Sequence, residues 1–187
     1  LLETVAHFSD VQLGKGIVYA KDTPNFIGNR IGTFSVLNVM RLMQEMNFSI
    51  EDVDALTGSA VGWPKSATFR TIDLVGLDIL SHVVSNTAQN VHDERSDLKL
   101  PDFYRQMLER KWLGDKTKAG FYKKSKSTDG NEERLALDWK TLEYRVRQKP
   151  KFTSIDMAKN VDDTGARVRM LLGLDGSGSK ADPAGQF

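Results

Sequence analysis

Residues 21–31 read Lys-Asp-Thr-Pro-Asn-Phe-Ile-Gly-Asn-Arg-Ile and lie where a short apolar run passes into a long helical pattern. The apolar run at 16–20, Gly-Ile-Val-Tyr-Ala, predicts a buried strand. Thr23 is a suitable helix N-cap, and Pro24 suits the first helical position because proline lacks the amide proton that would be unpaired there. The pattern therefore predicts a strand followed by a helix from about Pro24 to Met46, with a broad apolar face.

Polar and bare positions recur along the start of this predicted helix. Asn25, Asn29 and Thr33 are spaced four residues apart and would share one polar stripe. Gly28 and Gly32 form a neighbouring stripe without side chains, which lets a ligand or another backbone come close. Asparagine is a poor helix former, so its place here is typical of a substrate-facing surface. The residues alone leave a second interpretation open, in which Asn29 is a helix-face amide that contacts another backbone.

The rest of the chain is mostly helical by its apolar spacing. Helical spacing recurs over residues 1–13, over 67–90 around Gly76, over 101–113 and over 155–172. Ser49 is expected to cap a short helix whose first turn holds Glu51 and Asp52, where acidic groups favour the helix dipole. The stretch 67–90 is apolar almost all round, as a buried central hairpin would be. The sequence thus predicts an all-α fold with a short strand at 16–20, which needs a pairing partner from outside the chain.

Composition excludes several classes of function. The 187 residues contain no cysteine, which excludes disulfides, thiolate zinc sites and thiol catalysis, and fits a cytoplasmic protein. A net charge of +1 gives no general attraction to nucleic acid, and no apolar run of about 18 residues predicts a membrane span. The chain starts without a methionine or a secretory pattern and within a helical pattern, so we expect a piece of a longer protein.

Other residue patterns give weak indications of chemistry. His7, His82 and His92 have no acidic partners at metal-ligand spacing, so we expect surface roles and no metal site. Gly176–Ala181 has the form G-x-G-x-x-A, but a dinucleotide site needs that motif between a strand and a helix. With only a short tail following, we expect a flexible loop there.

A basic segment around Phe121–Tyr122 has two interpretations. Its lysines are Lys116, Lys118, Lys123, Lys124 and Lys126. They could form an anion site, for example for the phosphate groups of a cofactor. They could equally belong to a solvated loop that the two aromatic residues anchor to the core. Residues 136–147, further along, give a poor signal for either strand or helix.

Several motifs follow one another between residues 22 and 122. They are Asp22–Arg30 (Asp-Thr-Pro-Asn-Phe-Ile-Gly-Asn-Arg), Trp63-Pro64, Asp73–Asp78 (Asp-Leu-Val-Gly-Leu-Asp) and Lys116–Tyr122 (Lys-Thr-Lys-Ala-Gly-Phe-Tyr). Motifs in this order resemble the 3-hydroxyacyl-CoA dehydrogenase family. The resemblance implies the C-terminal helical domain of that family, of the 6-phosphogluconate dehydrogenase C-terminal type. It assigns 1–20 to the last helix and strand of an NAD-binding domain, 21–126 to the C-terminal domain and 127–150 to a linker. Residues 151–187 then resemble the truncated start of a second helical domain, as in bacterial fusions with enoyl-CoA hydratase parts.

The family resemblance also implies an activity, the NAD-dependent oxidation of 3-hydroxyacyl-CoA to 3-ketoacyl-CoA in fatty acid β-oxidation. The family's catalytic His, Glu and Ser lie in the NAD-binding domain, so only its asparagine carries over, onto Asn29. Asn25, Gly28 and Gly32 are implied as substrate-side residues, although the family usually has Gly or Ala in place of Asn25. NAD would serve the full enzyme, and we expect none bound to this chain alone, which should be inactive.

The partners implied are an acyl-CoA substrate, the missing NAD-binding domain and a second copy of the chain as a homodimer, with no nucleic acid and no membrane. Two other functions stay open. In one, the predicted helix 24–46 and the hairpin 67–90 mainly form a dimer or interdomain interface. In the other, the chain is the helical domain of a dehydrogenase acting on different hydroxy acids.

Overall fold

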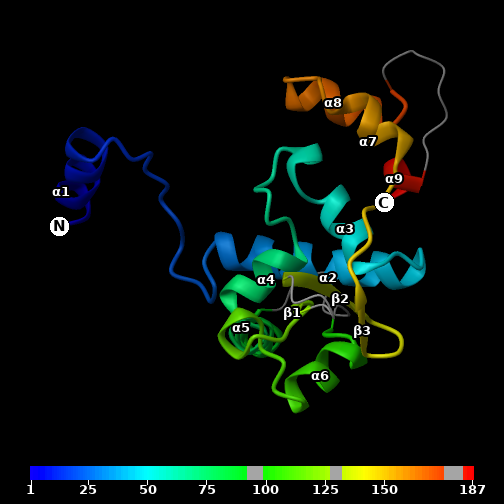
Figure 1. The fold of residues 1–187 in the computed structure, drawn as a ribbon. Coiled ribbons are helices and arrows are strands. Elements are labelled where there is room, and N and C mark those ends of the chain that lie inside the picture. Colours follow the sequence, from blue (N-terminus) through cyan, green and yellow to red (C-terminus); the bar gives the residue numbers. More distant parts are fainter. Residues whose placement is uncertain (92–98, 127–131, 175–182) are drawn as a thin grey trace.

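The computed structural model describes residues 1–91, 99–126, 132–174 and 183–187. His92 and the Gly176–Ala181 motif lie outside the described residues. The described chain forms a mainly helical body with a small antiparallel sheet (Figure 1). A helical N-terminal arm lies away from that body at the end of an extended segment (Figure 1).

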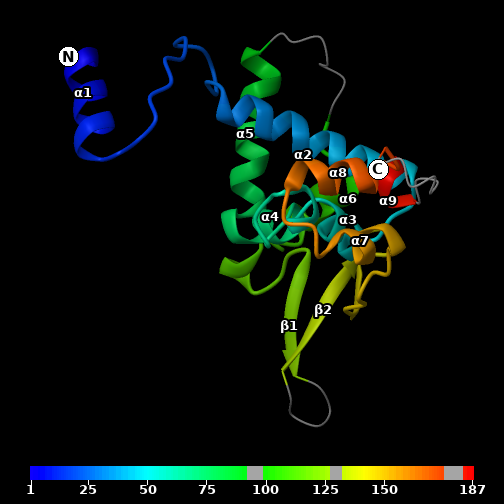
Figure 2. The same ribbon diagram turned by 90° about the horizontal axis from the view of Figure 1, so that it is seen from above.

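Helix α2 (Gly28–Glu45) crosses the body beside α5 (Leu77–Asn90) (Figures 1 and 2). It begins four residues later than the predicted start at Pro24, because Asn25 and Phe26 have φ angles of 63° and 46°, which no right-handed helix accepts. The buried positions of α2 have helical spacing and are Thr33, Leu37, Met40 and Met43. One face of α2 therefore belongs to the core, as the sequence predicted.

The short helices that follow confirm the predicted order. Helix α3 (Ile50–Leu56) begins with a capping box, in which the Ser49 and Asp52 side chains each accept from the other's backbone amide. After a 3-10 turn η2 (Ser59–Val61), α4 (Phe69–Val75) and α5 meet at Gly76. Gly76 has a φ of 107°, a conformation that residues with a Cβ rarely adopt. The α4–α5 pair is not wholly buried as predicted, since Leu74, Val75 and Ile79 are exposed.

The sheet is the main departure from the predicted all-α fold. After α6 (Asp102–Glu109) and the turn η3 (Asp115–Thr117), the chain forms β1 (Tyr122–Lys126), β2 (Glu132–Asp138) and β3 (Glu143–Val146). They pair antiparallel in the order β1-β2-β3. These strands lie in the range that the sequence indicated as a basic loop and a linker. Figure 2 shows β1 and β2 extending from the body as a long hairpin.

The predicted strand at 16–20 is wrong. Residues 16–20 have no regular structure, and Val18 and Tyr19 are exposed. An isolated strand leaves its backbone amides and carbonyls unpaired, so the apolar run alone does not fold as one. The arm before it contains α1 (Leu2–His7) and a π-helical turn (Phe8–Gln12), and no residue of either is buried.

The C-terminal part also differs from the prediction of one continuous helix at 155–172. It forms α7 (Thr153–Ala158) and α8 (Thr164–Leu171), followed by α9 (Pro183–Gln186). The break arises because Asp163 caps α8, its side chain accepting from the Ala166 amide at 2.7 Å. Helix α8 packs on η2, and the terminal Phe187 ring lies 5.6 Å from that of Phe48.

The core joins the helices to the base of the sheet. Its buried side chains include Met40, Met43, Ile50, Val53, Phe69, Leu77, Phe103, Tyr104, Met107, Phe121 and Leu137. Phe121 is central, because its ring centroid lies 4.5 Å from that of Phe69 and 6.1 Å from that of Tyr104. The hairpin therefore shares the core of the helical body.

Candidate functional site

The predicted site residues lie at the start of α2. Asn29 is exposed in the first turn of the helix. Asn25 lies before the helix, and its amide nitrogen donates to the Thr87 hydroxyl of α5 at 2.5 Å. Thr33 is buried, and among the described residues its hydroxyl has no hydrogen-bond partner. The predicted polar stripe is therefore wrong at Asn25, which is not helical, whereas Asn29 and Thr33 share one face of α2 with only Thr33 buried.

Open space surrounds the bare glycines. A Cβ placed on Gly28 or Gly32 would meet no described atom within 4 Å, so internal packing does not require glycine at either position. The large apolar side chains near Asn29 in the sequence are also exposed, and they are Phe26, Ile27, Ile31 and Phe34. We call these four side chains the α2 apolar surface. Such a cluster marks a surface that something else covers.

A buried carboxylate joins two of the sequence motifs. Asp73 of α4 accepts hydrogen bonds from the amides of Phe121 and Tyr122, each at 2.8 Å. A Cβ on Gly120 would lie 2.0 Å from the Asp73 carboxylate, so only glycine allows this approach. Nearby, Lys116 donates to both carboxylate oxygens of Asp78. Hydrogen bonds therefore connect the motif Asp73–Asp78 to the motif Lys116–Tyr122 and join α4 and α5 to the start of the sheet. The sequence did not predict this contact.

A second carboxylate, that of Asp54 on α3, is partly buried. Asp54 accepts from the Phe69 amide at 2.7 Å and the Arg70 amide at 3.2 Å, at the start of α4. It also accepts from the Tyr122 hydroxyl at 2.8 Å. Burial raises the pKa of Asp54 to about 6 and that of Asp73 to about 7, and their hydrogen-bond donors offset part of each rise.

We expect the free energy of unfolding to fall as the pH rises from about 4 to about 7. Over that range, folded Asp54 and Asp73 hold protons that unfolded aspartates, with a pKa of 3.8, have released, so rising pH favours unfolding. Asp78 and Asp115 have lowered pKa values, so their opposite contribution lies below about pH 4. Urea unfolding across this pH range should show a smaller fall in the free energy of unfolding for Asp73→Asn than for the unaltered chain. A free energy of unfolding that increases from pH 4 to 7 would contradict the raised pKa values of Asp54 and Asp73.

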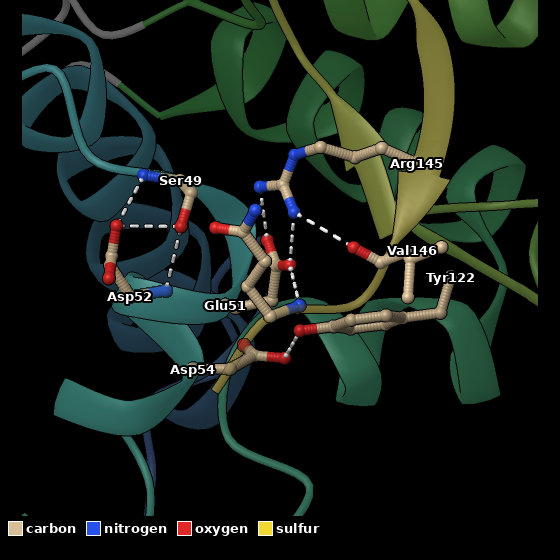
Figure 3. A network of polar contacts seen from close by, with 8 residues as sticks. Ser49, Glu51, Asp52, Asp54, Tyr122, Arg145 and Val146 are labelled. Carbon is tan, nitrogen blue, oxygen red and sulfur yellow. Dashed lines mark hydrogen bonds and ion pairs between the residues drawn. The ribbon is translucent and has the colours of Figure 1, made fainter. Parts of the chain in front are cut away.

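Glu51 of α3 fixes the helix to the sheet (Figure 3). Its carboxylate accepts from both terminal nitrogens of Arg145 on β3, at 2.6 and 2.9 Å. It also accepts from the backbone amide of Gln148 at 3.0 Å. Figure 3 shows the Arg145 guanidinium lying over this carboxylate, with the Tyr122 hydroxyl directed at Asp54. The pair is a structural connection on the side of α3 that faces the sheet.

Only part of the basic segment lines a cavity. Lys118, Lys123 and Lys124 border a groove of about 630 Å³ beside β1 and β2. Lys116 pairs with Asp78 instead. The anion-site interpretation therefore concerns Lys118, Lys123 and Lys124, whereas Lys116 forms an ion pair.

Neither a metal-type cluster of side chains nor a membrane-length helix is present in the described residues. Across these ranges, no group of three or more His, Cys, Asp or Glu side chains could hold a metal ion, and His7 and His82 are exposed. Within the same ranges, no helix has the length and apolar content to cross a bilayer.

The chain is similar to proteins of one known family. Residues 26–124 match the family described as "3-hydroxyacyl-CoA dehydrogenase, C-terminal domain". The "Probable 3-hydroxyacyl-CoA dehydrogenase" of Bacillus subtilis is 42% identical over 176 residues, covering 94% of this chain and 22% of the relative. A protein of the same name in Deinococcus radiodurans is 41% identical over 126 residues, covering 67% of this chain and 36% of the relative.

Relatives with lower sequence identity are also hydroxyacyl-CoA dehydrogenases by name or similar in fold. The human "Hydroxyacyl-coenzyme A dehydrogenase, mitochondrial" is 33% identical over 121 residues, covering 65% of this chain and 38% of that protein. The crystal structure of FadB2 from M. tuberculosis superposes with a TM-score of 0.57 at 26% identity, covering 66% of this chain and 42% of that one. The chain spans well under half the length of each of these relatives. Its family match covers more than half of its own residues, so the chain belongs to the family of 3-hydroxyacyl-CoA dehydrogenase C-terminal domains.

Proposed function

We propose that this chain is the substrate-side domain of an NAD-dependent 3-hydroxyacyl-CoA dehydrogenase, which converts 3-hydroxyacyl-CoA to 3-ketoacyl-CoA in fatty acid β-oxidation. Family membership supports the reaction class. The observation that carries the proposal for this chain is the position of Asn29, an exposed amide in the first turn of α2, next to the open Gly28 and Gly32 positions. A thioester substrate needs such a polar donor where its chain can approach.

Asn29 would act through hydrogen bonding. Its amide N–H groups can donate to a substrate oxygen on which negative charge develops. The N-cap Ile27 gives the first turn of α2 no side-chain hydrogen bond among the described residues, so the partial positive charge of the helix start faces the same space. Both groups favour an anion at this position.

The described residues do not fit NAD. Their only sheet is antiparallel, whereas dinucleotide sites form on a parallel strand–helix unit with a glycine-rich turn. We therefore propose that NAD and the catalytic base belong to another domain, and that residues 1–20 are its last segment. Residues 151–187 as the start of a second helical domain stay a proposal too. Similarity to the Bacillus subtilis relative over 94% of the chain, beyond the 26–124 family match, supports both.

The reaction itself is tested by NADH formation. We expect the chain alone to form no NADH from a 3-hydroxyacyl-CoA, because it lacks the base and the NAD site. Joined to an NAD-binding domain from a relative, it should oxidise 3-hydroxyacyl-CoA but not the same hydroxy acid without CoA. Equal rates on the free hydroxy acid would favour the alternative, a dehydrogenase acting on other hydroxy acids. Turnover by the isolated chain would contradict the division of roles.

The α2 apolar surface supports a second proposal, that the NAD-binding domain or another copy of the chain covers it. Exposed Leu74, Val75 and Ile79 on α4 and α5 extend the apolar area available for such contacts. Sedimentation velocity over a range of concentrations separates the two partners. A dimer that Ile31→Asp dissociates would support a homodimer, and a monomer at every concentration would leave the NAD-binding domain as the partner.

A further inference from the structure

The groove beside β1 and β2 lies outside the proposed substrate site. Its lining comes from α3, α4, η3, β1, β2 and the segment after β3, and none of it comes from α2. A volume of about 630 Å³ is in the range of small-molecule sites, which typically occupy about 300–1,000 Å³. The groove therefore needs an explanation separate from Asn29.

The exposed charge of the groove is positive. Its acidic lining residues are already engaged: Glu51 binds Arg145, Asp115 binds both terminal nitrogens of Arg70, and Asp54 accepts the Tyr122 hydroxyl. Among the described residues, Lys65, Lys118 and Arg134 have no carboxylate within ion-pair distance. Lys124 lies 3.8 Å from the Glu132 carboxylate, which is exposed. Besides Arg70, the basic side chains along the groove are Lys65, Lys118, Lys123, Lys124, Arg134 and Arg147.

These cations come from separate parts of the sequence. Lys65 precedes α4, Lys118 follows η3, Arg134 is on β2 and Arg147 follows β3. The fold thus concentrates positive charge in one concave place, although the chain as a whole has a net charge of only +1. A general affinity for nucleic acid would instead need an extended basic face. The concentrated charge suits a compact anion with several negative groups.

A second cavity adjoins the basic groove. It measures about 400 Å³, and Asp54, Ala55, Lys65 and Pro150 line both spaces. Its other lining residues include apolar groups of α7 and the preceding segment, together with charged groups; they include Phe152, Ile155, Ala158, Lys149, Asp156, Lys159 and Arg167. The second cavity thus adds an apolar surface to the cations of the groove.

We propose that this composite groove binds a nucleoside diphosphate group, with the phosphates among the basic side chains and the base against the apolar surface of the second cavity. Lysine and arginine make charge-assisted hydrogen bonds to phosphate, and a planar base buries its faces against apolar side chains. A free nucleotide and the nucleotide end of coenzyme A share this chemistry. Binding here does not use Asn29, so it stands apart from the proposed reaction.

Calorimetric titration of the 187-residue chain with ADP, inorganic pyrophosphate and coenzyme A tests the proposal. The variant Lys118→Gln/Arg134→Gln removes two exposed cations from the groove. The matched control Lys15→Gln/Arg105→Gln removes the same charge at exposed positions outside it, where Arg105 pairs with exposed Asp102. Circular dichroism should show both variants folded, since every substituted side chain is exposed.

We expect saturable ADP binding that the groove variant weakens by at least about tenfold, the scale of one lost charge-assisted hydrogen bond. The control variant should bind as the unaltered chain does. Coenzyme A binding tighter than ADP would identify the coenzyme as the source, and ADP alone would identify a free nucleotide. No saturable ADP binding, or equal weakening in both variants, would overturn the proposal. Equal affinities for pyrophosphate and ADP would overturn the placement of the base.

Discussion

Replacing Asn29 by Ala should lower kcat of the complete dehydrogenase by about 10²- to 10³-fold, the loss seen when one donor to a developing oxyanion is removed. The side chain is exposed in the first turn of α2 and packs against nothing in the core, so the change should not unfold the domain. Steady-state NADH formation from a 3-hydroxyacyl-CoA measures the effect. The loss should fall on kcat more than on KM, because the hydrogen bond strengthens as charge develops.

Two further variants sharpen the Asn29 test. Asn29→Asp keeps the shape but has no N–H to donate, so it should lose at least as much turnover as Asn29→Ala. Asn86→Ala changes another exposed helical asparagine, on α5, and should leave kcat unaltered. Unchanged turnover in Asn29→Ala would return this residue to the other interpretation, a surface amide that meets a neighbouring backbone.

Replacing Arg145 by Met should lower the free energy of unfolding by about 3 kcal/mol, at the lower end of values for a broken buried ion pair. The Glu51 side chain is 1% exposed, so its charge would remain in the interior without the guanidinium, whereas Arg145 is 31% exposed. That partial exposure keeps the expected loss near the low end. Urea unfolding followed by circular dichroism measures it.

Controls separate burial from simple charge loss. Arg105→Met removes an arginine whose pair with Asp102 is exposed on both sides, and it should cost less than about 1 kcal/mol. Glu51→Gln/Arg145→Met leaves no buried charge and should recover part of the stability lost in Arg145→Met. A double variant less stable than Arg145→Met would show that the carboxylate is stabilised by other groups, with the Gln148 amide as the first candidate.

Helices were predicted well from sequence where the signal was local. The Ser49–Asp52 capping box and the break at Gly76 need only neighbouring residues, and both are present in the structure. The sheet was missed because its stability comes from distant contacts. Leu137 and Phe121 are fully buried, but short strands bordered by lysine and glutamate carry little periodic signal of their own.

The positions of the proposed site residues were predicted from sequence in part. Asn29 and the glycines lie together at an open helix start, but helical spacing wrongly extended the polar stripe to Asn25, which is not helical. The left-handed backbone at 25 and 26 could not be read from residue types, since Phe rarely adopts it. The contact of buried Asp73 with the segment at Gly120 had only one indication in the sequence. An acidic residue and glycines occur within motifs that are far apart in the chain. Only the fold shows that they meet.

The hydrogen bond from Asn25 to Thr87 bears on how the enzyme would be tuned. It fastens the turn before α2 to α5, next to the first turn of α2 that holds Asn29. For the donor role that we propose for Asn29, this contact outside the site would preorganise the side-chain amide, so substitution of Thr87 would alter turnover without touching substrate.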